Sequence, residues 1–195
     1  MSNEAKGKRG GDSLFQEIIR PTLVLILVSV VVGALLAVTY NVAGIADLAS
    51  AGLKQEVLDE AMPDVLPAGT SLKSMKTGID DANILGVYKD EGGAGIAVHV
   101  SVKGYSDGLQ LLIGLDSGGV ITGIKALENQ ETNGIGSKAL TPEYFQSFVG
   151  KSAGVTVGKG GDVDAFAGAT YTSKGIGDGV NKAFEAYEAV KGDLS

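Results

Sequence analysis

The chain has 195 residues and a net charge of −7, and it has no cluster of lysine and arginine outside the N-terminal tail. This charge pattern argues against a nucleic-acid partner, which needs grouped basic side chains. The absence of cysteine excludes disulfides, thiolate nucleophiles, cysteine-ligated zinc and iron-sulfur clusters, so any redox chemistry requires an added cofactor. Thirty glycines, about twice the usual share, predict tight turns and close backbone approach to a ligand.

The N-terminal part of the chain predicts a membrane anchor. Residues 1–20 carry four basic and three acidic side chains, and residues 21–46 carry no charge. That uncharged stretch is long enough for one helix across the hydrocarbon core, and longer than a cleaved signal peptide, the alternative, requires. The basic tail places the N-terminus in the cytoplasm. We therefore expect a cytoplasmic tail at 1–20, a transmembrane helix at 21–46 and one extracytoplasmic domain at 47–195 in the cell membrane.

The first half of that domain predicts a helix followed by strands. Apolar residues recur at helical spacing over residues 48–62, and Pro63 is expected to end the helix. Alternating, β-branched runs separated by glycine turns then predict strands at Ile84–Asp90, Ala94–Val102, Leu109–Asp116 and Val120–Leu127, with a further short strand at Val155–Val157. The single histidine, His99, lies on one of these strands and is interpreted as a structural or surface residue.

The second half predicts two helices. Thr141 is expected to cap a short helix that begins at Pro142. A long final helix is indicated by apolar residues from Ile176 to Val190 at helical spacing, with Thr172 or Ser173 as its N-cap and with glycines 175, 177 and 179 serving close packing. Strands and helices do not alternate, which argues against a Rossmann fold. We expect an α+β domain with an antiparallel sheet and flanking helices.

The segment before the final helix is a candidate phosphate site. Thr170 follows the small residues Gly168 and Ala169 and stands just ahead of the expected helix start. Free N–H groups and the positive end of the helix dipole favour a phosphate there, and Lys174 adds a positive charge. An ordinary capped helix after a turn of small residues explains the same pattern, so the local sequence alone leaves both interpretations open.

The run from Asp164 to Ser173 resembles the flavin-attachment motif of the membrane-anchored, covalently flavinylated subunits of Rnf and Na+-translocating NADH:quinone oxidoreductase complexes. That motif reads Asp-x-x-Ser/Thr-Gly-Ala-Thr, then any residue and Thr or Ser, and this chain has Ala167 at the Ser/Thr position. The matching residues are Asp164, Gly168, Ala169, Thr170, Thr172 and Ser173. The resemblance implies that a flavin transferase recognises the motif, including Asp164, and joins FMN through its phosphate to the hydroxyl of Thr170.

Two earlier segments resemble the same family in the same order. Lys103–Leu109 is similar to its Gly-Tyr-x-x-x-Leu/Ile loop, and Glu131–Gly136 is similar to its Glu-Thr-Pro-Gly-Leu-Gly loop, with Asn133 in place of proline. The second loop lies against the flavin ring in the family. The resemblance implies that the ring's polar edge contacts the Glu131 carboxylate and the backbone of Thr132, Gly134, Ile135 and Gly136, while Ile135 or Leu140 covers its face.

These resemblances imply an electron carrier similar to the G subunits of Rnf complexes, which pass electrons between ferredoxin and NAD+ while Na+ or H+ crosses the membrane. Its partners would be the other membrane subunits, the flavin transferase and membrane lipid, with the NAD and ferredoxin sites on other subunits. The sequence offers no catalytic side-chain set and no metal-ligand cluster. The alternatives are the C subunit of the quinone reductase, a membrane-anchored binding module without a redox role, and a separate flavin domain for an extracellular reductase.

Overall fold

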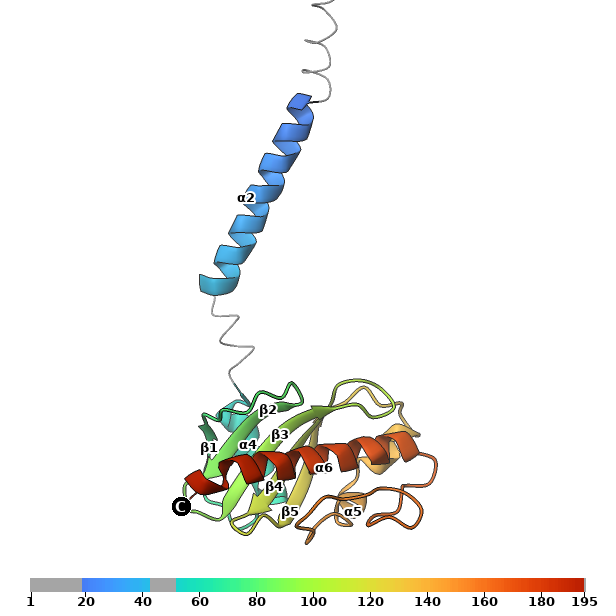
Figure 1. The fold of residues 1–195 in the computed structure, drawn as a ribbon. Coiled ribbons are helices and arrows are strands. Elements are labelled where there is room, and N and C mark those ends of the chain that lie inside the picture. Colours follow the sequence, from blue (N-terminus) through green and yellow to red (C-terminus); the bar gives the residue numbers. More distant parts are fainter. Residues whose placement is uncertain (1–18, 43–51, 195) are drawn as a thin grey trace, which may run out of the picture. The chain divides into compact units, whose positions relative to one another are not determined.

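The computed structural model describes residues 19–42 and 52–194 (Figure 1). They belong to two compact units, Met1–Ala51 and Gly52–Ser195. In the first unit, helix α2 spans Arg20–Val42. No helix formed by the described residues reaches the length and apolarity that a membrane crossing requires. Residues 1–18 of the predicted tail and residues 43–46 of the predicted span lie outside the described part of the chain.

The second unit is an α+β domain built on one five-stranded antiparallel sheet, as predicted. The strands hydrogen-bond in chain order, each antiparallel to the next. Their bounds are β1 (Leu72–Met75), β2 (Ile84–Asp90), β3 (Gly95–Val102), β4 (Leu109–Asp116) and β5 (Ile121–Glu128). The helical elements are α4 (Gln55–Val65), η2 (Gly136–Ala139), α5 (Pro142–Phe145), α6 (Thr170–Val190) and η3 (Lys191–Asp193).

Four of the five strands lie where the alternating pattern predicts them, to within one residue. β1 was not predicted, because its sequence LKSM is short and only Leu72 of the four residues is fully buried. It pairs with β2 at the edge of the sheet. The short strand predicted at Val155–Val157 is wrong as a strand, since this segment contributes only an isolated parallel bridge between Val157 and Val163.

The two faces of the sheet carry separate hydrophobic clusters. Val98 and Val100 of β3 pack in one cluster with Ile176 and Val180 of α6, which crosses the sheet in Figure 1. Ala97, the residue directly before Val98, packs on the other face in a cluster that includes residues of α4. Strand residues alternate between faces, so both faces of β3 are buried by helices. The long final helix is therefore fixed on a buried sheet, which makes its N-terminus a firmly placed part of the domain.

His99 of β3 is buried, with 5% of its surface exposed. Its Nε2 atom lies 2.9 Å from Oε1 of Gln110 on the neighbouring strand β4. Burial lowers the pKa of the imidazole, which favours its neutral form. The residue has the environment of a structural histidine, in agreement with its interpretation from the sequence.

The final helix α6 begins earlier than its cap residues predicted. Its first residue is Thr170 and the N-cap position is Ala169, so Thr172 and Ser173 are not caps but buried residues inside the first turns. Both were mistaken for caps because their hydroxyls are common cap groups, whereas here the Thr172 hydroxyl donates to Glu131 and the Ser173 hydroxyl accepts from Phe166 N–H in the preceding turn. The helix glycines serve close packing, as expected: a Cβ atom on Gly175 would lie 2.5 Å from the carbonyl oxygen of Lys103.

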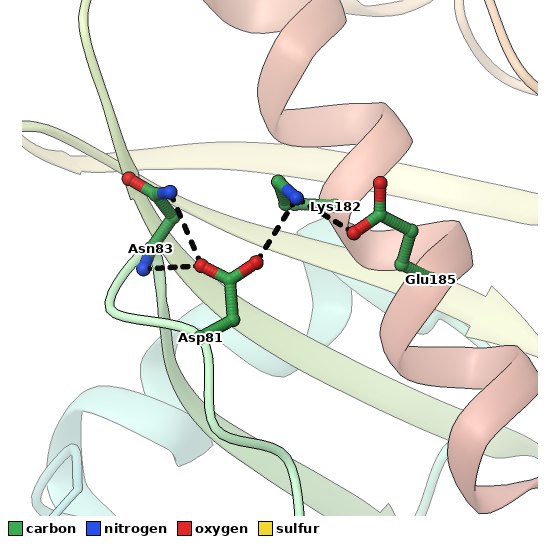
Figure 2. Close-up of polar contacts among 4 residues, drawn as sticks. All are labelled: Asp81, Asn83, Lys182 and Glu185. Atoms are coloured by element: carbon green, nitrogen blue, oxygen red, sulfur yellow. Dashed lines mark hydrogen bonds and ion pairs between the residues drawn. The ribbon is translucent and has the colours of Figure 1, made fainter.

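An ion pair fastens the segment before β2 to α6 (Figure 2). Asp81 Oδ2 lies 2.9 Å from Nζ of Lys182, which also pairs with Glu185 at 2.7 Å. The other carboxylate oxygen accepts hydrogen bonds from the backbone and side-chain nitrogens of Asn83. The Asn83 backbone N–H and then the Lys182 ammonium hold the pKa of Asp81 below its usual value. The ion pair therefore joins α6, which packs on the sheet, to the connection between β1 and β2.

Helix α4 continues past Pro63, which was expected to end it, and stops at Val65. Proline disfavours a helix interior because it lacks an N–H and crowds the preceding turn. Here tertiary contacts hold the last residues: Val65 is fully buried, and its carbonyl oxygen accepts a hydrogen bond from Oγ1 of Thr122 on β5. Packing against the sheet therefore outweighs the local preference of the proline.

The end of α4 lies directly on two strand glycines. A Cβ atom on Gly114 would lie 1.8 Å from the carbonyl oxygen of Val65, and one on Gly123 would lie 1.9 Å from that of Asp64. We expect Gly114→Ala to lower the free energy of unfolding by about 2 kcal/mol, because the helix must move away from the sheet. Urea unfolding followed by circular dichroism measures this change. Gly78→Ala is the matched control, since its added Cβ atom meets nothing within 4 Å; equal urea midpoints for the two variants would contradict the prediction.

Asp90 at the end of β2 is fully buried and acts as a hydrogen-bond acceptor for two loops. Its Oδ1 atom accepts from the backbone N–H groups of Thr70 and Ser71 at 2.7 and 2.9 Å, and Oδ2 accepts from that of Ala94 at 2.9 Å. Burial alone raises the pKa of this carboxyl group, but these hydrogen bonds outweigh burial and leave the pKa below its usual value. The carboxylate form therefore stabilises the turns at one end of the sheet.

A lowered folded-state pKa gives Asp90 a defined effect on acid stability. Its contribution is complete above the unfolded-state pKa of about 3.9 and is lost as the pH falls through the lower folded-state value. We expect Asp90→Asn to cost about 2 kcal/mol at neutral pH, because one charged acceptor is replaced by a donor facing Ala94 N–H. The difference between variant and wild type should shrink below pH 4 in urea titrations at a series of pH values. A difference that stays constant down to pH 2 would contradict this role.

Candidate functional site

Three segments that are distant in the sequence meet at the carboxylate of Glu131. This side chain is 7% exposed. Its Oε2 atom accepts a 2.7 Å hydrogen bond from the hydroxyl of Thr172 in the first turn of α6, and Oε1 accepts from the backbone N–H of Ser106 at 3.2 Å. One buried carboxylate thus joins the loop between β3 and β4, the loop after β5 and the start of α6.

Two glycines leave the space that this carboxylate occupies. A Cβ atom on Gly104 would lie 2.3 Å from Oε1 of Glu131, and one on Gly136 would lie 2.0 Å from Oε2. Both distances are far below a van der Waals contact, so any side chain at either position would displace the carboxylate. Glycine is therefore required at both motif positions for the same reason: it lets the backbone approach the Glu131 carboxylate.

The loop from Thr132 to Gly136 makes a tight turn on the surface. Gly134 has a φ of +78°, a conformation that favours glycine, and its N–H donates to Oγ of Ser137 at 2.9 Å. The N–H of Ile135 donates to the carbonyl oxygen of Thr132 at 3.1 Å. Ile135 is 55% exposed, whereas Leu140 is partly buried against the core. Of the two residues predicted to cover a flavin ring, Ile135 is the one whose side chain is presented to the surface.

The start of α6 combines an exposed hydroxyl residue with an uncapped helix end. Thr170 is the first helical residue and is exposed. Among the described residues, no side chain caps the N-terminus of this helix. The first backbone N–H groups of a helix lack partners within the helix, and they point where an anion is most favourably held. The position of Thr170 therefore suits a group that carries phosphate.

The turn before Thr170 is held by the side chain of Ser173, a residue in the first turn of α6. Gly168 has a φ of +81°, which favours glycine, and Ala169 is buried. The hydroxyl of Ser173 donates to the carbonyl oxygen of Ala169 at 2.9 Å and accepts from the N–H of Phe166 at 3.0 Å. Ser173 therefore fixes the turn that presents Thr170 to solvent.

Asp164 and Ala167, the two other motif positions, are both exposed on the approach to this turn. The carbonyl oxygen of Asp164 accepts a 3.0 Å hydrogen bond from the hydroxyl of Tyr144, which leaves the Asp164 side chain on the surface. Lys174 is also exposed. The segment thus presents a surface that another protein can reach.

Of the predicted site residues, the structure brings Glu131, Gly136 and Thr172 into direct proximity. The Glu131 carboxylate, predicted to face a flavin ring, lies inside the protein and is bonded to Thr172 and Ser106. Sequence analysis assigned no role to Ser106 or to the exposed rings of Tyr105 and Tyr171. The position of Tyr171 directly after Thr170 was the available signal. No group of acidic or histidine side chains among the described residues is suited to hold a metal ion.

Comparison with known proteins identifies one domain family, relatives among oxidoreductase subunits and one solved structure. Residues 104–185 match the family of FMN-binding domains. The G subunit of an ion-translocating oxidoreductase complex from Methanosarcina acetivorans is 32% identical over 91% of this chain and 98% of its own length. The G subunit of the Na+-translocating ferredoxin:NAD+ oxidoreductase complex from Acetobacterium woodii is 32% identical over 85% of this chain and 89% of its own. The crystal structure of NqrC from Shewanella oneidensis aligns with 73% of this chain and 77% of its own at 24% identity and a TM-score of 0.45.

Proposed function

Because this chain belongs to the family of G subunits of ion-translocating oxidoreductase complexes, we propose that it relays electrons through FMN bound by its extracytoplasmic domain. The chain has no cysteine and therefore no iron-sulfur cluster of its own. FMN supplies reversible uptake and release of electrons, and the protein binds and orients it. The relatives' names support a place in an ion-translocating ferredoxin:NAD+ oxidoreductase, and we propose that the ion moved across the membrane is Na+ or H+.

The observation that carries this proposal is the exposed Thr170 at the uncapped start of α6. The free N–H groups of the first turn can bind phosphate oxygens, and the small residues Gly168 and Ala169 leave room beside the hydroxyl. The FMN phosphate therefore fits this position. Thr172 and Ser173 support it from within, because their hydroxyls hold the helix start to Glu131 and to the preceding turn.

We further propose that the FMN is attached covalently through a phosphoester to Oγ1 of Thr170. A flavin transferase would form this Oγ1–P bond from a flavin dinucleotide as its phosphoanhydride bond breaks, with a nucleoside monophosphate leaving and the hydroxyl proton released. The exposed side chain of Asp164 offers the transferase a recognition group, and the exposed Ala167 leaves the approach unobstructed. A covalent bond keeps the cofactor on a carrier that exchanges electrons with several partners.

The loop from Thr132 to Gly136 is proposed to bind the polar edge of the flavin ring through backbone groups, with Glu131 behind it. The other subunits of the complex then supply and accept the electrons. The uncharged sequence of residues 21–46 supports a single membrane anchor surrounded by lipid, with the tail in the cytoplasm and the domain at 47–195 on the extracytoplasmic side.

Co-expression of the chain with a flavin transferase tests this function. After full denaturation and electrophoresis, the protein band should fluoresce under ultraviolet light, and the folded protein should show a flavin absorbance that a reductant bleaches and air restores. A fluorescent band without reversible bleaching would contradict the electron-carrier role. A dark band would favour a membrane-anchored binding module without redox activity.

A further inference from the structure

Three of the four large exposed hydrophobic side chains in residues 52–194 belong to the segments of the proposed flavin site. The four are Leu85, Tyr105, Ile135 and Tyr171, which are 42%, 64%, 55% and 70% exposed. Isolated exposed hydrophobic residues are common on protein surfaces, but a group of them marks a binding surface. All except Leu85 belong to the three segments that meet at Glu131. The distribution therefore indicates that an apolar group covers this region of the surface.

Tyr105 and Tyr171 already contact each other. Their ring centroids are 6.3 Å apart with an interplanar angle of 63°, an edge-to-face arrangement. Each ring is next to an anchor of the Glu131 carboxylate: Tyr105 precedes Ser106, whose N–H is bonded to Oε1, and Tyr171 precedes Thr172, whose hydroxyl is bonded to Oε2. The backbone positions of the two rings are thus fixed by one buried side chain, even though the rings themselves are exposed.

An edge-to-face pair with this much exposed surface leaves ring area free for a third aromatic group. Stacking such a group on the pair removes apolar surface from water and adds a favourable ring contact. The nearest candidate is the flavin ring, because Tyr171 directly follows the residue that carries the FMN phosphate. The ribityl chain between phosphate and ring gives the ring enough reach to lie beside the attachment point.

We propose that Tyr105 and Tyr171 form the platform on which the isoalloxazine ring lies. This proposal rests on the attachment of FMN at Thr170. It assigns the two tyrosines as direct contacts of the ring face, in addition to the backbone contacts of the loop from Thr132 to Gly136. Glu131 is then a positioning residue for the platform, since it holds both tyrosine-bearing segments.

Flavin fluorescence tests the platform directly. A tyrosine ring in contact with a flavin quenches its emission by electron donation to the excited flavin, and a phenylalanine ring of nearly the same shape does not. For each protein, the emission of the folded sample is divided by that of the same sample after denaturation, which corrects for the amount of bound flavin. We expect this ratio to be low for the native chain and to rise severalfold in the double variant Tyr105→Phe, Tyr171→Phe.

Tyr187→Phe is the matched control, because Tyr187 lies at the other end of α6, where its hydroxyl donates to the carbonyl oxygen of Ser117. Its emission ratio should equal that of the native chain. An unchanged ratio in the double variant, with flavin still present after denaturation, would overturn the platform and leave the tyrosines as a surface for a protein partner. A native chain with no flavin after denaturation would overturn the proposed function, and the platform with it.

Discussion

Replacing Thr170 by valine is expected to abolish covalent flavin attachment. Valine keeps the branched shape of threonine but removes the hydroxyl, so no phosphoester can form. The fold should be retained, because Thr170 is exposed at the first position of α6, and substitutions at such positions change stability by about 0.5 kcal/mol or less. In-gel fluorescence after denaturation and the intact mass of the protein both measure attachment. The native band should fluoresce, and the Thr170→Val band should be dark at the mass of the unmodified chain.

Two further variants make this result specific. Thr170→Ser keeps a hydroxyl at the attachment position and should retain flavin. Thr77→Val makes the same chemical change at a half-buried position outside the three motif segments, and it should fluoresce like the native chain. A fluorescent Thr170→Val band would mean that the flavin is attached elsewhere, and a dark Thr77→Val band would mean that loss of fluorescence reports misfolding.

Local patterns in the sequence were sufficient for the strands with two buried faces and for the final helix. β3 and β4 are runs of β-branched and aliphatic residues between glycine turns, and the structure has them at the predicted positions. The apolar spacing from Ile176 to Val190 likewise predicts the buried face of α6, whose residues pack on the sheet as expected. These elements are set by short-range periodicity, so one sequence suffices to find them.

Features that depend on long-range contacts could not be predicted in this way. β1 forms only because β2 offers an edge, and α4 passes Pro63 because Gly114 and Gly123 let its last turn approach the sheet. Glu131 is a similar case at the site. The resemblance implied only that its carboxylate contacts the flavin ring, and its burial depends on Ser106 and Thr172, which are 25 and 41 residues away in the sequence.

The same contacts explain why the motif segments occur together in one domain. Gly104 and Gly136 both leave space for the Glu131 carboxylate, and Thr172 completes its hydrogen bonds. Each motif therefore contains at least one residue whose structural role depends on a contact with another of the three segments. A site of this kind is an assembly of surface loops supported by one buried polar centre, so the surface residues depend on the centre for their positions.

Removing this centre by Glu131→Ala is therefore expected to affect both stability and flavin attachment. The substitution leaves the buried hydroxyl of Thr172 and the N–H of Ser106 without their acceptor and creates a cavity between three segments. We expect the free energy of unfolding to fall by about 3 kcal/mol. Flavin attachment by the transferase should fall as well, because the first turn of α6 loses the bond that holds it to the loop after β5. Urea unfolding and the fluorescence of the denatured band measure the two effects.

The conservative variant and a surface variant separate these effects. Glu131→Gln keeps one oxygen acceptor and offers an amide donor that the Thr172 hydroxyl can accept, so it should lose less than half as much stability as Glu131→Ala. Glu91→Ala, in an exposed turn, should match the native chain in both measurements. If the urea midpoint of Glu131→Ala equalled that of the native chain, the Glu131 carboxylate would not stabilise the three segments as its hydrogen bonds indicate. If it were destabilised but still fully flavinylated, then the start of α6 would be held for attachment by Ser173 and the preceding turn alone.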